Sequence, residues 1–454
     1  MKLFKSKDFN PNYLAKIVNI TEFTKHPNPD CTGLKCAHVG GYNISVSKDM
    51  PEGLYVYFPI GVQINSNILS RSNLYRKAEL NRDSEKTGFF DDNGRVKAIK
   101  LQKYPSEGFL MPIKNLQDSY SEKIEFEEGL EFDSIELNHG TDWICKKYVV
   151  KSRQLRSYHT KVAKQPKGLD KLVENQFRFH YDTILIKKNP YAVQPNDIIS
   201  ITSKVHGTSG ISSLVICKKP LSFKDRLIRF LFGKNKVLDL QYDDLWSSRK
   251  VVKNKFYNKN ADTGYYGVDV WGEAHKILKP HLTKGLTLYY EIIGYLPDGG
   301  AIQSLGGQAY DYGCVPPTEG ETYTYNKHFK IQVYRITYTN PDGIVYEFSA
   351  KQVQQWCQVQ GLDPVQELYY GYAKDLYPDL DTNWNENFIQ RLSEDKNFYM
   401  EELSPICKNK VPHEGIVIKV ENSKSEAYKL KCFRFLEKES KAQDKGESNI
   451  EDNA

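Results

Sequence analysis

The charge of the sequence changes abruptly from negative to positive near residue 142, and this change divides the chain into two parts. From Asp118 to Asp142 there are nine acidic residues and one basic residue, whereas from Trp143 to Gly168 there are eight basic residues and no acidic one. The basic stretch also lacks hydrophobic periodicity, which is typical of a linker. We therefore expect a domain over 1–140, a basic linker over 141–168 and a second domain over 169–436, followed by a polar tail over 437–454 that is disordered. A solvated linker and a nucleic-acid contact both remain explanations of the basic stretch.

Composition excludes several other classes of protein. The 454 residues carry a net charge of only +6, so charge alone names no partner. No apolar run approaches the roughly 20 residues that span a bilayer, and the first residues, MKLFKSKDFN, have no apolar core of the signal-peptide type. We expect a cytoplasmic protein with no membrane partner.

The eight cysteines are scattered without the spacing of a disulfide framework. Cys31, Cys36 and His38, with His26 upstream, could in principle ligate zinc. Their spacing is looser than that of a zinc hairpin, and no second pair follows. Free thiols are the simpler expectation.

The spacing of β-rich runs and turns in the first domain is typical of a small β-barrel. Short β-rich runs alternate with turn signals such as HPNPDCTG, DMPEG and DDNG. The segment HPNPDCTGLKCAHVGGYNISVS resembles the start of oligonucleotide-binding (OB) folds of the tRNA-binding type, which carry nucleic acid on an exposed face. Arg95, Lys97, Lys100 and Lys103 could then contact phosphates, although an ordinary solvated strand explains them as well.

A lysine stands where a predicted strand of the second domain meets a turn. The run NDIISITSK ends at Lys204 and is followed by the turn-prone VHGTSG. Gly207 would let a ligand approach the backbone closely. A lysine can act as a nucleophile where burial or neighbouring cations favour its neutral form. By itself this pattern is weak, because most lysines lie on the surface.

Charged and aromatic residues recur in four later β-rich runs. LTLYYEIIGYLP carries Glu291, FKIQVYRITY carries Tyr334, HEGIVIKV carries Glu414 and Lys419, and AYKLKCFRF carries Lys429 and Lys431. A strand would place Lys429 and Lys431 on one face, where two cations suit a polyphosphate. The carboxylates suit a hard cation such as Mg²⁺, and the tyrosine could stack on a base. Taken singly, each is equally explained by a strand with exposed charges.

The order of these runs resembles a known superfamily. KVHGTSG, YYEIIG, KIQVYR, HEGIVIK and YKLK are similar to motifs I, III, IIIa, IV and V of the covalent nucleotidyltransferases, which include polynucleotide ligases and capping enzymes. The histidine after the lysine is typical of RNA ligases, since DNA ligases and capping enzymes usually have aspartate there. NQFRFHYDT, and DDLWSSRKVVKNK with Arg249, are similar to the same branch. The resemblance covers Gln176 to Phe435. It implies an α+β fold in which an OB-like barrel precedes an antiparallel-sheet, ATP-grasp-like ligase core.

The resemblance implies an ATP-dependent RNA ligase that serves RNA repair. Lys204 would attack the α-phosphorus of ATP and become lysyl-AMP; AMP would pass to an RNA 5′-phosphate, and a 3′-hydroxyl would displace it. Glu291 and Glu414 would hold Mg²⁺ (or Mn²⁺) and the ribose. The residues that the resemblance places at the nucleotide or the RNA end are His206, Gly207, Ser209, Arg249, Glu291, Tyr334, Glu414, Lys419, Lys429 and Lys431. We expect a monomer that binds RNA ends at a nick or in a duplex.

The sequence departs from the family pattern at two positions. Ser209 replaces the asparagine of some relatives, and Arg335 stands where others have an acid, so recognition of the RNA end is expected to differ. In addition, Glu414 and Lys419 are five residues apart and fall on opposite faces of a regular strand. We expect a turn or bulge at Gly415 to bring both to the pocket.

Two alternatives remain open at this point. The first is another covalent nucleotidyltransferase, either a DNA ligase or a GTP-using capping enzyme. The second is a non-catalytic RNA-binding protein with a degenerate ligase core.

Two helices are also expected. Residues 220–236, PLSFKDRLIRFLFGKNK, are basic and apolar enough for a short amphipathic helix. Packing on the core is the ordinary explanation of its apolar face, and contact with a membrane or RNA is the alternative. A second helix should begin near Ser349 and end at Gly361.

Overall fold

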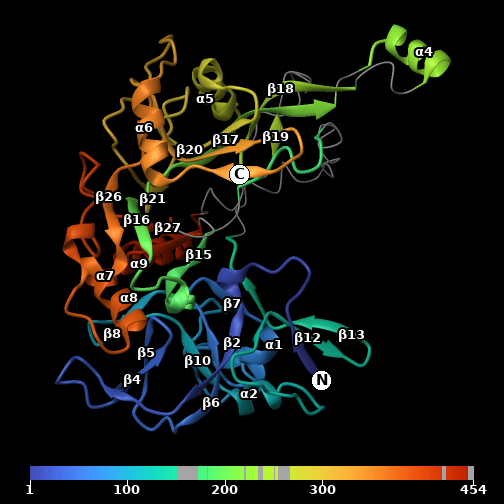
Figure 1. Cartoon of the computed structure of the whole chain (residues 1–454). Coiled ribbons are helices and arrows are strands. Elements are labelled where there is room, and N and C mark those ends of the chain that lie inside the picture. Colours follow the sequence, from blue (N-terminus) through green and yellow to red (C-terminus); the bar gives the residue numbers. More distant parts are fainter. Residues whose placement is uncertain are drawn as a thin grey trace.

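The computed structural model describes residues 1–150, 172–180, 183–218, 221–233, 239–249, 251–253, 266–421 and 426–447. Figure 1 shows the N-terminal residues, blue to teal, as one lobe and the later residues, green to red, as a second lobe above it. Most of the predicted basic linker lies outside the described residues. Within the described ranges, no helix has the length and apolar character needed to cross a membrane.

The N-terminal lobe consists mainly of short antiparallel strands. They are β1 (Lys2–Phe4), β2 (Ala15–Ile20), β3 (Thr24–Lys25), β4 (Leu34–Val39), β5 (Tyr42–Ser47), β6 (Gly53–Phe58), β7 (Val62–Ile64), β8 (Ile99–Leu101), β9 (Tyr104–Ser106), β10 (Phe109–Pro112), β11 (Glu131–Phe132), β12 (Ser134–Leu137), β13 (Gly140–Trp143) and β14 (Cys145–Lys147). Two short helices, α1 (Ser66–Arg71) and α2 (Ile113–Gln117), interrupt them.

These strands form several small sheets. The largest has the order β10-β6-β2-β11, and the others are β1-β12-β13, β3-β4-β5, β14-β7 and β8-β9. The pairings among the described residues do not close into a single barrel. The mainly β character expected from the sequence is therefore present, whereas the barrel is not established.

Local sequence explains the strands of this lobe. In β2 and β6, β-branched and aromatic residues predominate, and Ile17, Val56 and Phe58 are buried in one core. Strands β4 and β5 are joined by Gly40 and Gly41, and Gly40 has φ +54°. Such a two-residue glycine turn fits the twist of a hairpin.

The second lobe is built on two larger sheets. The five-stranded sheet, β15-β28-β27-β16-β26, contains β15 (Ile184–Leu185), β16 (Ile198–Ser203), β26 (Glu367–Tyr372), β27 (Gly415–Val420) and β28 (Ala427–Lys431). The seven-stranded sheet runs β19-β18-β17-β20-β23-β24, with β25 paired to β23. Its strands are β17 (Thr208–Lys218), β18 (Leu240–Ser247), β19 (Val252–Lys253), β20 (Leu286–Gly294), β23 (Phe329–Thr339), β24 (Val345–Glu347) and β25 (Asp363–Pro364). A small hairpin joins β21 (Ser304–Leu305) to β22 (Gln308–Ala309).

Three of the helices of the second lobe, α5 (Val270–Leu278), α6 (Ala350–Gln360) and α8 (Trp384–Glu394), pack against these sheets. The remaining helices are α4 (Phe223–Phe232), α7 (Ala373–Leu376) and α9 (Phe433–Asp444). Helices α5 and α6 pack on β20 and β23 in one apolar core, and α8 packs with the five-stranded sheet in another. Helix α6 begins after Ser349, whose side chain caps it, and ends before Gly361 in the left-handed conformation, as its sequence predicted.

Helix α9 joins the two lobes. The guanidinium of Arg95 donates to the carbonyl of Ser440 at 2.8 Å and to the carboxylate of Asp444 at 2.7 Å, and its side chain is only 1% exposed. Lys97 also pairs with Asp444, at 2.7 Å. Two predictions are corrected here. Arg95 and Lys97 hold α9 and do not form an open basic face, and residues 437–444, expected to be disordered, are helical because they find these cationic partners.

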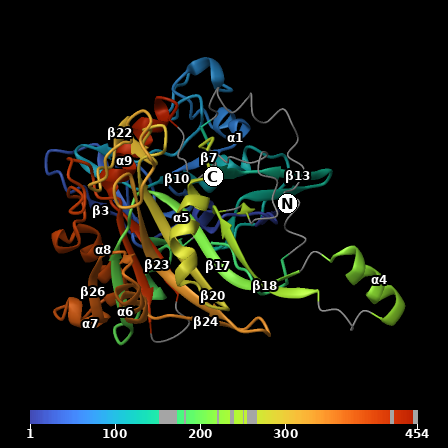
Figure 2. The same cartoon turned by 90° about the horizontal axis from the view of Figure 1, so that it is seen from above.

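Helix α4 departs from its expected packing. It forms over the predicted segment, but none of its residues is buried. Figures 1 and 2 both show it standing away from the rest of the molecule, beyond the ends of β17 and β18. The expectation that its apolar face packs on the core is therefore wrong.

Candidate active site

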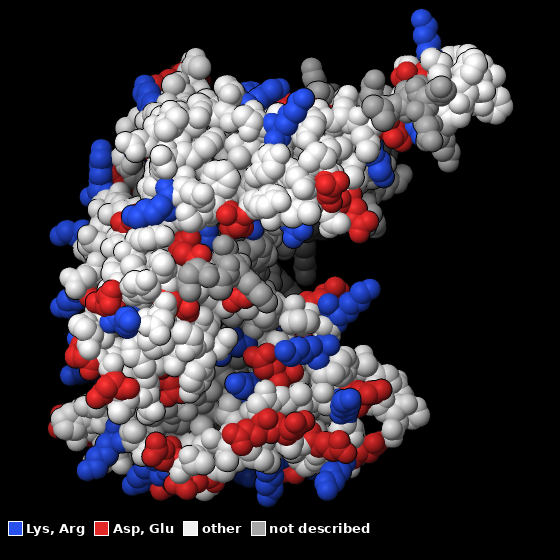
Figure 3. All heavy atoms as spheres, in the orientation of Figure 1, with Lys and Arg blue, Asp and Glu red and all other residues white. Residues whose placement is uncertain are grey.

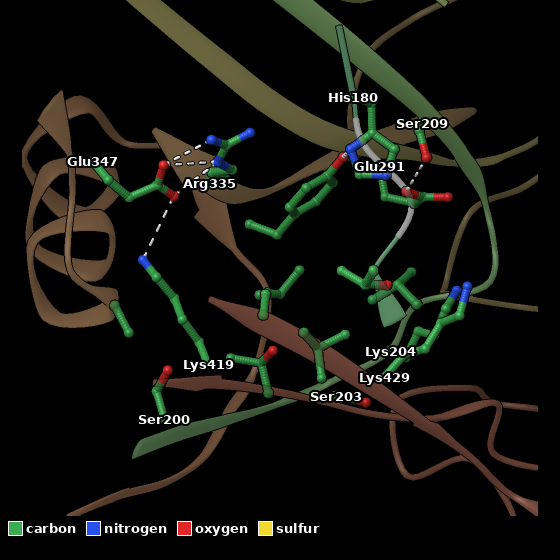
Figure 4. A pocket seen from close by; sticks show the side chains of 18 of the residues that line it. His180, Ser200, Ser203, Lys204, Ser209, Glu291, Arg335, Glu347, Lys419 and Lys429 are labelled. Carbon is green, nitrogen blue, oxygen red and sulfur yellow. Dashed lines mark hydrogen bonds and ion pairs between the residues drawn. The ribbon is translucent and has the colours of Figure 1, made fainter. Parts of the chain in front are cut away.

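A pocket lies between the two sheets of the second lobe, with one wall from each. The five-stranded sheet and the loop after it contribute Ser200, Thr202, Lys204, Val417, Lys419 and Lys429. The seven-stranded sheet contributes Ser209, Glu291, Tyr334, Arg335 and Glu347. Figure 4 shows Lys204 and Lys429 close together on one side of this pocket, with Glu291 and Ser209 opposite them. Motifs that are more than 200 residues apart in the chain therefore meet in one place.

Lys204 is held at the end of β16 by its backbone and its side chain. Its backbone N–H donates to the carbonyl of Gly415 at 2.8 Å. Its Nζ lies 2.8 Å from Oε1 of Glu414, and the lysine side chain is 16% exposed against 2% for the glutamate. The lysine thus reaches the pocket while its ammonium is paired with a buried carboxylate.

Gly415 allows Glu414 to reach this position. Its φ is +140°, and an added Cβ would stand 2.1 Å from the carbonyl oxygen of Leu430. Any other residue would therefore be strained and would collide with β28. Because the backbone turns here, Glu414 contacts Lys204 while Val417 and Lys419, further along β27, line the pocket. The expected turn at Gly415 is therefore present, but Glu414 is not among the residues that line the pocket, so only Lys419 reaches it.

Glu414 is surrounded by basic side chains. Besides Lys204, Nζ of Lys431 lies 3.6 Å from its Oε1, and Nδ1 of His206 lies 3.3 Å from its Oε2. Burial by itself would raise the pKa of Glu414, but the nearby Lys204, His206 and Lys431 together outweigh it and lower that pKa to about 2. Glu414 is therefore a carboxylate at neutral pH.

His206 lies behind the pocket wall. It is 5% exposed, its ring packs on Tyr310 and Phe435, and its backbone N–H donates to the hydroxyl of Tyr312 at 2.8 Å. It is not among the residues that line the pocket between the sheets. His206 therefore influences Lys204 only indirectly, through the carboxylate of Glu414 that both residues contact.

Glu291 lies in the middle of β20 and faces the pocket. It is 6% exposed, and its Oε2 accepts a hydrogen bond from the hydroxyl of Ser209 at 3.2 Å. Gly207 lies close by, and a Cβ added to it would stand 2.4 Å from the carbonyl oxygen of Ile292 and 2.8 Å from Cγ of Glu291. The missing side chain of Gly207 therefore allows the loop to pack on β20, which differs from the ligand approach that the sequence suggested.

Tyr334 lies on β23 and forms part of the same wall. Its hydroxyl lies 3.3 Å from Nδ1 of His180, and the two rings make a T-shaped contact. Figure 4 shows His180 beside Glu291 at one side of the pocket. Sequence reasoning placed His180 in a matching stretch but gave it no role.

A second cavity opens on the other side of Lys204. It is lined by Lys204, Arg249, Lys429 and Lys431, and the N-terminal lobe adds Tyr13, Tyr42, Glu107 and Lys147. Lys429 and Lys431 point to one face of β28, as their spacing predicted. Three cations, Arg249, Lys429 and Lys431, therefore line the same cavity as Lys204, next to side chains of the first lobe.

Lys419 lies at the far end of the pocket from Lys204. Its Nζ donates to the carbonyl of Phe348 at 2.7 Å and lies 3.7 Å from Glu347. Glu347 in turn accepts two hydrogen bonds from Nε and Nη2 of Arg335, both at 2.8 Å. Figure 4 shows this group of three on the side opposite Lys204. Lys419, expected at the phosphates, is therefore separated from Lys204 and Lys429.

Two residues of this site were missed by the sequence analysis. Glu347 lies on β24, which pairs with the strand of Arg335, and only this hairpin pairing could have indicated it. His413 lies just before Glu414, and its Nε2 is 2.9 Å from the hydroxyl of Ser203. Burial lowers the pKa of His413 to about 4, so this histidine is neutral at neutral pH. It supports the residue that precedes Lys204.

The two predicted metal ligands differ in their surroundings. In the part of the chain that the structure describes, no three His, Cys, Asp or Glu residues gather as a metal site. Mg²⁺ often has one or two carboxylates, with phosphates and water supplying the other ligands. Glu291, which faces the pocket, fits such a role, whereas Glu414 is already paired with Lys204 and Lys431.

No family model and no curated protein matches the sequence. Solved structures of an RNA ligase from Naegleria gruberi are nevertheless similar. One with PPi has a TM-score of 0.52 at 13% identity, covering 95% of this chain and 100% of that one. Another, a lysine variant with AMP and Mn, has a TM-score of 0.51 at 14% identity, covering 94% and 98%. A third structure, of another lysine variant with ATP and Mn, has a TM-score of 0.51 at 13% identity, covering 96% and 100%. The chain therefore has the fold of an RNA ligase over nearly its whole length.

Proposed function

We propose that the protein is an ATP-dependent RNA ligase that joins a 3′-hydroxyl to a 5′-phosphate and serves RNA repair. The observation that carries the proposal is the position of Lys204, which faces a pocket between two sheets while Glu414, Lys429 and Lys431 surround it. The Naegleria ligases of the same fold were solved with ATP, AMP, PPi and Mn, which matches a pocket for a nucleotide and its phosphates.

The first step forms a phosphorus–nitrogen bond. The neutral amine of Lys204 attacks the α-phosphorus of ATP, pyrophosphate leaves, and lysyl-AMP remains. Before this, the ammonium must give up a proton and leave its contact with Glu414, which lies 2.8 Å away. Arg249, Lys429 and Lys431, which line the second cavity beside Lys204, would neutralise the charge of the phosphates.

The residues of the pocket would position the remaining parts of the nucleotide. Tyr334 and Val417 lie on opposite walls and could hold a base between them, and Ser209 lies next to Glu291 near the sugar and phosphate. A divalent cation, Mg²⁺ or Mn²⁺, bound by Glu291 would offset negative charge on the phosphates. Positioning and charge neutralisation account for most of the catalysis in phosphoryl transfer.

The second and third steps transfer AMP to RNA. A 5′-phosphate oxygen attacks the phosphorus of lysyl-AMP and releases Lys204. A 3′-hydroxyl then attacks the activated 5′-phosphate, and AMP leaves. We propose that the RNA ends are held at a nick or in a duplex by a monomer of the protein.

Covalent labelling tests the first step directly. The protein is incubated with α-labelled ATP and Mg²⁺, and the label that survives denaturation is measured. We expect label on the native protein, none on Lys204→Ala, and normal label on Lys396→Ala, a control that removes a lysine with an 82% exposed side chain. Label on Lys204→Ala would contradict the proposal. Label from GTP but not ATP would favour a capping enzyme, and strong RNA binding without label would favour a non-catalytic protein.

The N-terminal residues 1–140 are proposed to be an OB-like module that contacts the RNA, ahead of a nucleotidyltransferase domain at 169–436. Support comes from the second cavity, where Tyr13 and Tyr42 of this module, and Lys147 just after it, line the same space as Lys429. An RNA end bound there would reach Lys204 from the side of the N-terminal lobe.

A point variant tests this role better than a deletion, because removing residues 1–140 would also remove Arg95, the partner of α9. We expect Lys147→Ala to keep normal self-labelling with ATP and to seal a nicked RNA duplex more slowly at low RNA concentration. A matched change of an exposed lysine of the same lobe, Lys86→Ala, should alter neither. Equal sealing by both variants would contradict the RNA-binding role. Comparison of RNA with DNA nicks would separate an RNA ligase from a DNA ligase.

A further inference from the structure

Helix α4 concentrates the exposed apolar side chains of the molecule. Among the described residues, 21 large hydrophobic side chains are exposed, and six of them lie in this ten-residue helix. The exposed fractions are 82% for Phe223, 85% for Phe230 and 67% for Phe232. Leu227, Ile228 and Leu231 complete the set. In Figure 3 the protruding helix is mostly white, with few charged atoms. Such a concentration on an exposed segment marks an interaction surface.

Polar contacts at both ends hold the helix without covering its apolar side chains. The hydroxyl of Ser222 accepts a hydrogen bond from the backbone N–H of Asp225, and the carboxylate of Asp225 accepts one from the backbone N–H of Ser222. This capping box starts the helix, and Arg229 ties its last turn to Asp239 at 2.9 Å. The polar residues Asp225 and Arg229 are less exposed than the apolar ones. The apolar side therefore faces solvent.

The charge around α4 is strongly positive. From Lys218 to Asp239 the sequence has seven basic residues and two acidic ones, a net charge of 7 − 2 = +5. Lys224 and Arg226 are exposed on the helix itself. A short helix with aromatic and aliphatic residues on one side and cations beside them is the composition of segments that lie in the interface of an anionic membrane.

The shape of the apolar surface favours a membrane over a protein groove or RNA as the partner. Successive residues turn by about 100°, so Phe223, Leu227 and Leu231 form one stripe while Phe230 and Phe232 project roughly 160° apart. A protein groove would cover the stripe and leave the outer phenylalanines in water. RNA would use the cations and could stack on the phenylalanines, but it offers little to the leucines and Ile228. A lipid interface covers the whole set.

We infer that α4 is a membrane-binding element that inserts its apolar side into the interface of a bilayer containing anionic lipids. At about 15 Å, the ten-residue helix is too short to span a bilayer and would lie in its plane. It differs from a membrane span, which the described chain lacks, and it extends the partners beyond those expected from the sequence. Strand β17 separates α4 from Lys204 by 11 residues, or roughly 35 Å, so the pocket would remain open to solvent.

Vesicle cosedimentation with the full-length protein tests the inference. We expect the protein to sediment with vesicles of phosphatidylcholine and about one third phosphatidylserine, to bind pure phosphatidylcholine more weakly, and to be released by high salt. The double variant Phe230→Gln and Leu231→Gln should lower binding at least about tenfold, since each side chain contributes apolar burial. Lys224→Gln with Arg226→Gln should lose about tenfold on anionic vesicles only.

The control is Val359→Gln, which replaces a 74% exposed apolar side chain on α6 and should leave vesicle binding unchanged. Thermal unfolding of each variant should match that of the native protein, because none of the changed side chains is buried. This readout is independent of ligase activity.

Three results would overturn the inference. The first is no association of the native protein with anionic vesicles, and the second is equal association of the Phe230→Gln and Leu231→Gln variant. The third is a loss of RNA binding, or of self-association in sedimentation velocity, in that variant without any vesicle binding of the native protein. This last result would assign α4 to RNA or to a second copy of the chain.

Discussion

The two ends of the pocket each have a carboxylate between two cations, buried in the case of Glu414 and partly exposed in the case of Glu347, and the contacts differ in kind. At one end, Glu414 meets the ammonium groups of Lys204 at 2.8 Å and Lys431 at 3.6 Å. At the other end, Glu347 accepts a bidentate pair of hydrogen bonds from the guanidinium of Arg335. Lysine ammonium groups sit on flexible stems and exchange partners easily, whereas an arginine fork fixes its partner in one geometry. The pocket is therefore adjustable at the Lys204 end and fixed at the Glu347 end.

The fixed end has further support. Arg335 also stacks over the ring of Tyr289, with 4.5 Å between the guanidinium carbon and the ring centroid. Lys419 is tied to a backbone carbonyl of Phe348, and Glu421, which lies 3.9 Å from it, accepts a hydrogen bond from Ser200. These cations are occupied in holding two sheets together. The comparison predicts that changes at the Glu414 end affect the rate of reaction, while changes at the Glu347 end affect binding.

The largest effect is expected for Glu414→Gln. Glutamine keeps the shape but loses the charge that positions Lys204 and Lys431, so formation of lysyl-AMP should slow by about 10²- to 10³-fold. Single-turnover incorporation of labelled AMP measures this rate. Glu386→Gln, at an exposed position on α8, is the matched control and should be unchanged. A rate for Glu414→Gln within about threefold of the native rate would remove the distinction between the two ends.

A second prediction concerns stability in acid. The pKa of Glu414 is lowered from 4.5 to about 2 in the folded protein, so its ionised form stabilises the fold. This contribution is complete above about pH 4.5 and is lost as pH falls through the folded pKa near 2; it is on the order of 3 kcal/mol at neutral pH. Urea unfolding from about pH 7 to about pH 3 should show a shallower loss of stability in Glu414→Gln than in the native protein. Parallel curves would show that Glu414 does not gain stability from its cations.

The smallest effect is expected for Glu347→Gln. Loss of the charge loosens Arg335 and Lys419 at the end of the pocket away from Lys204, so KM for ATP should rise about tenfold while kcat changes less than about threefold. Steady-state sealing at varied ATP measures both constants. Glu273→Gln removes an exposed pair with Lys276 at 2.7 Å and should change neither. A larger fall in kcat than rise in KM would place Glu347 with the reacting end.

The sequence indicated some of the residues that the structure places around the pocket, but not all of them. Lys204, Glu291 and Lys429 could be anticipated because strand alternation and motif order fix residues near one another along each strand. Glu347 could not, since its contact with Arg335 depends on the pairing of β23 with β24. The motif placed His206 near the pocket, but it did not show that His206 is buried and contacts only Glu414 there. This burial results from packing of its ring against Tyr310.

Surfaces were harder to predict than the core. The periodicity of residues 223–232 indicates an amphipathic helix, and that helix forms, but periodicity carries no information on what covers its apolar side. Arg95 and Lys97 have the composition of a nucleic-acid face, yet their partners are about 345 residues later in the chain. Contacts at such separation leave no local pattern.

The docking of α9 also bears on how the chain is made. The ribosome synthesises the N-terminal lobe first. The guanidinium of Arg95 can be buried with its hydrogen-bond partners only after Ser440 and Asp444 have also been synthesised. An unpaired buried charge is costly, so the first lobe cannot reach its final packing until residues 440–444 have been synthesised. Segments about 345 residues apart therefore complete their folding together, and a product truncated before α9 would keep an open surface on its first lobe.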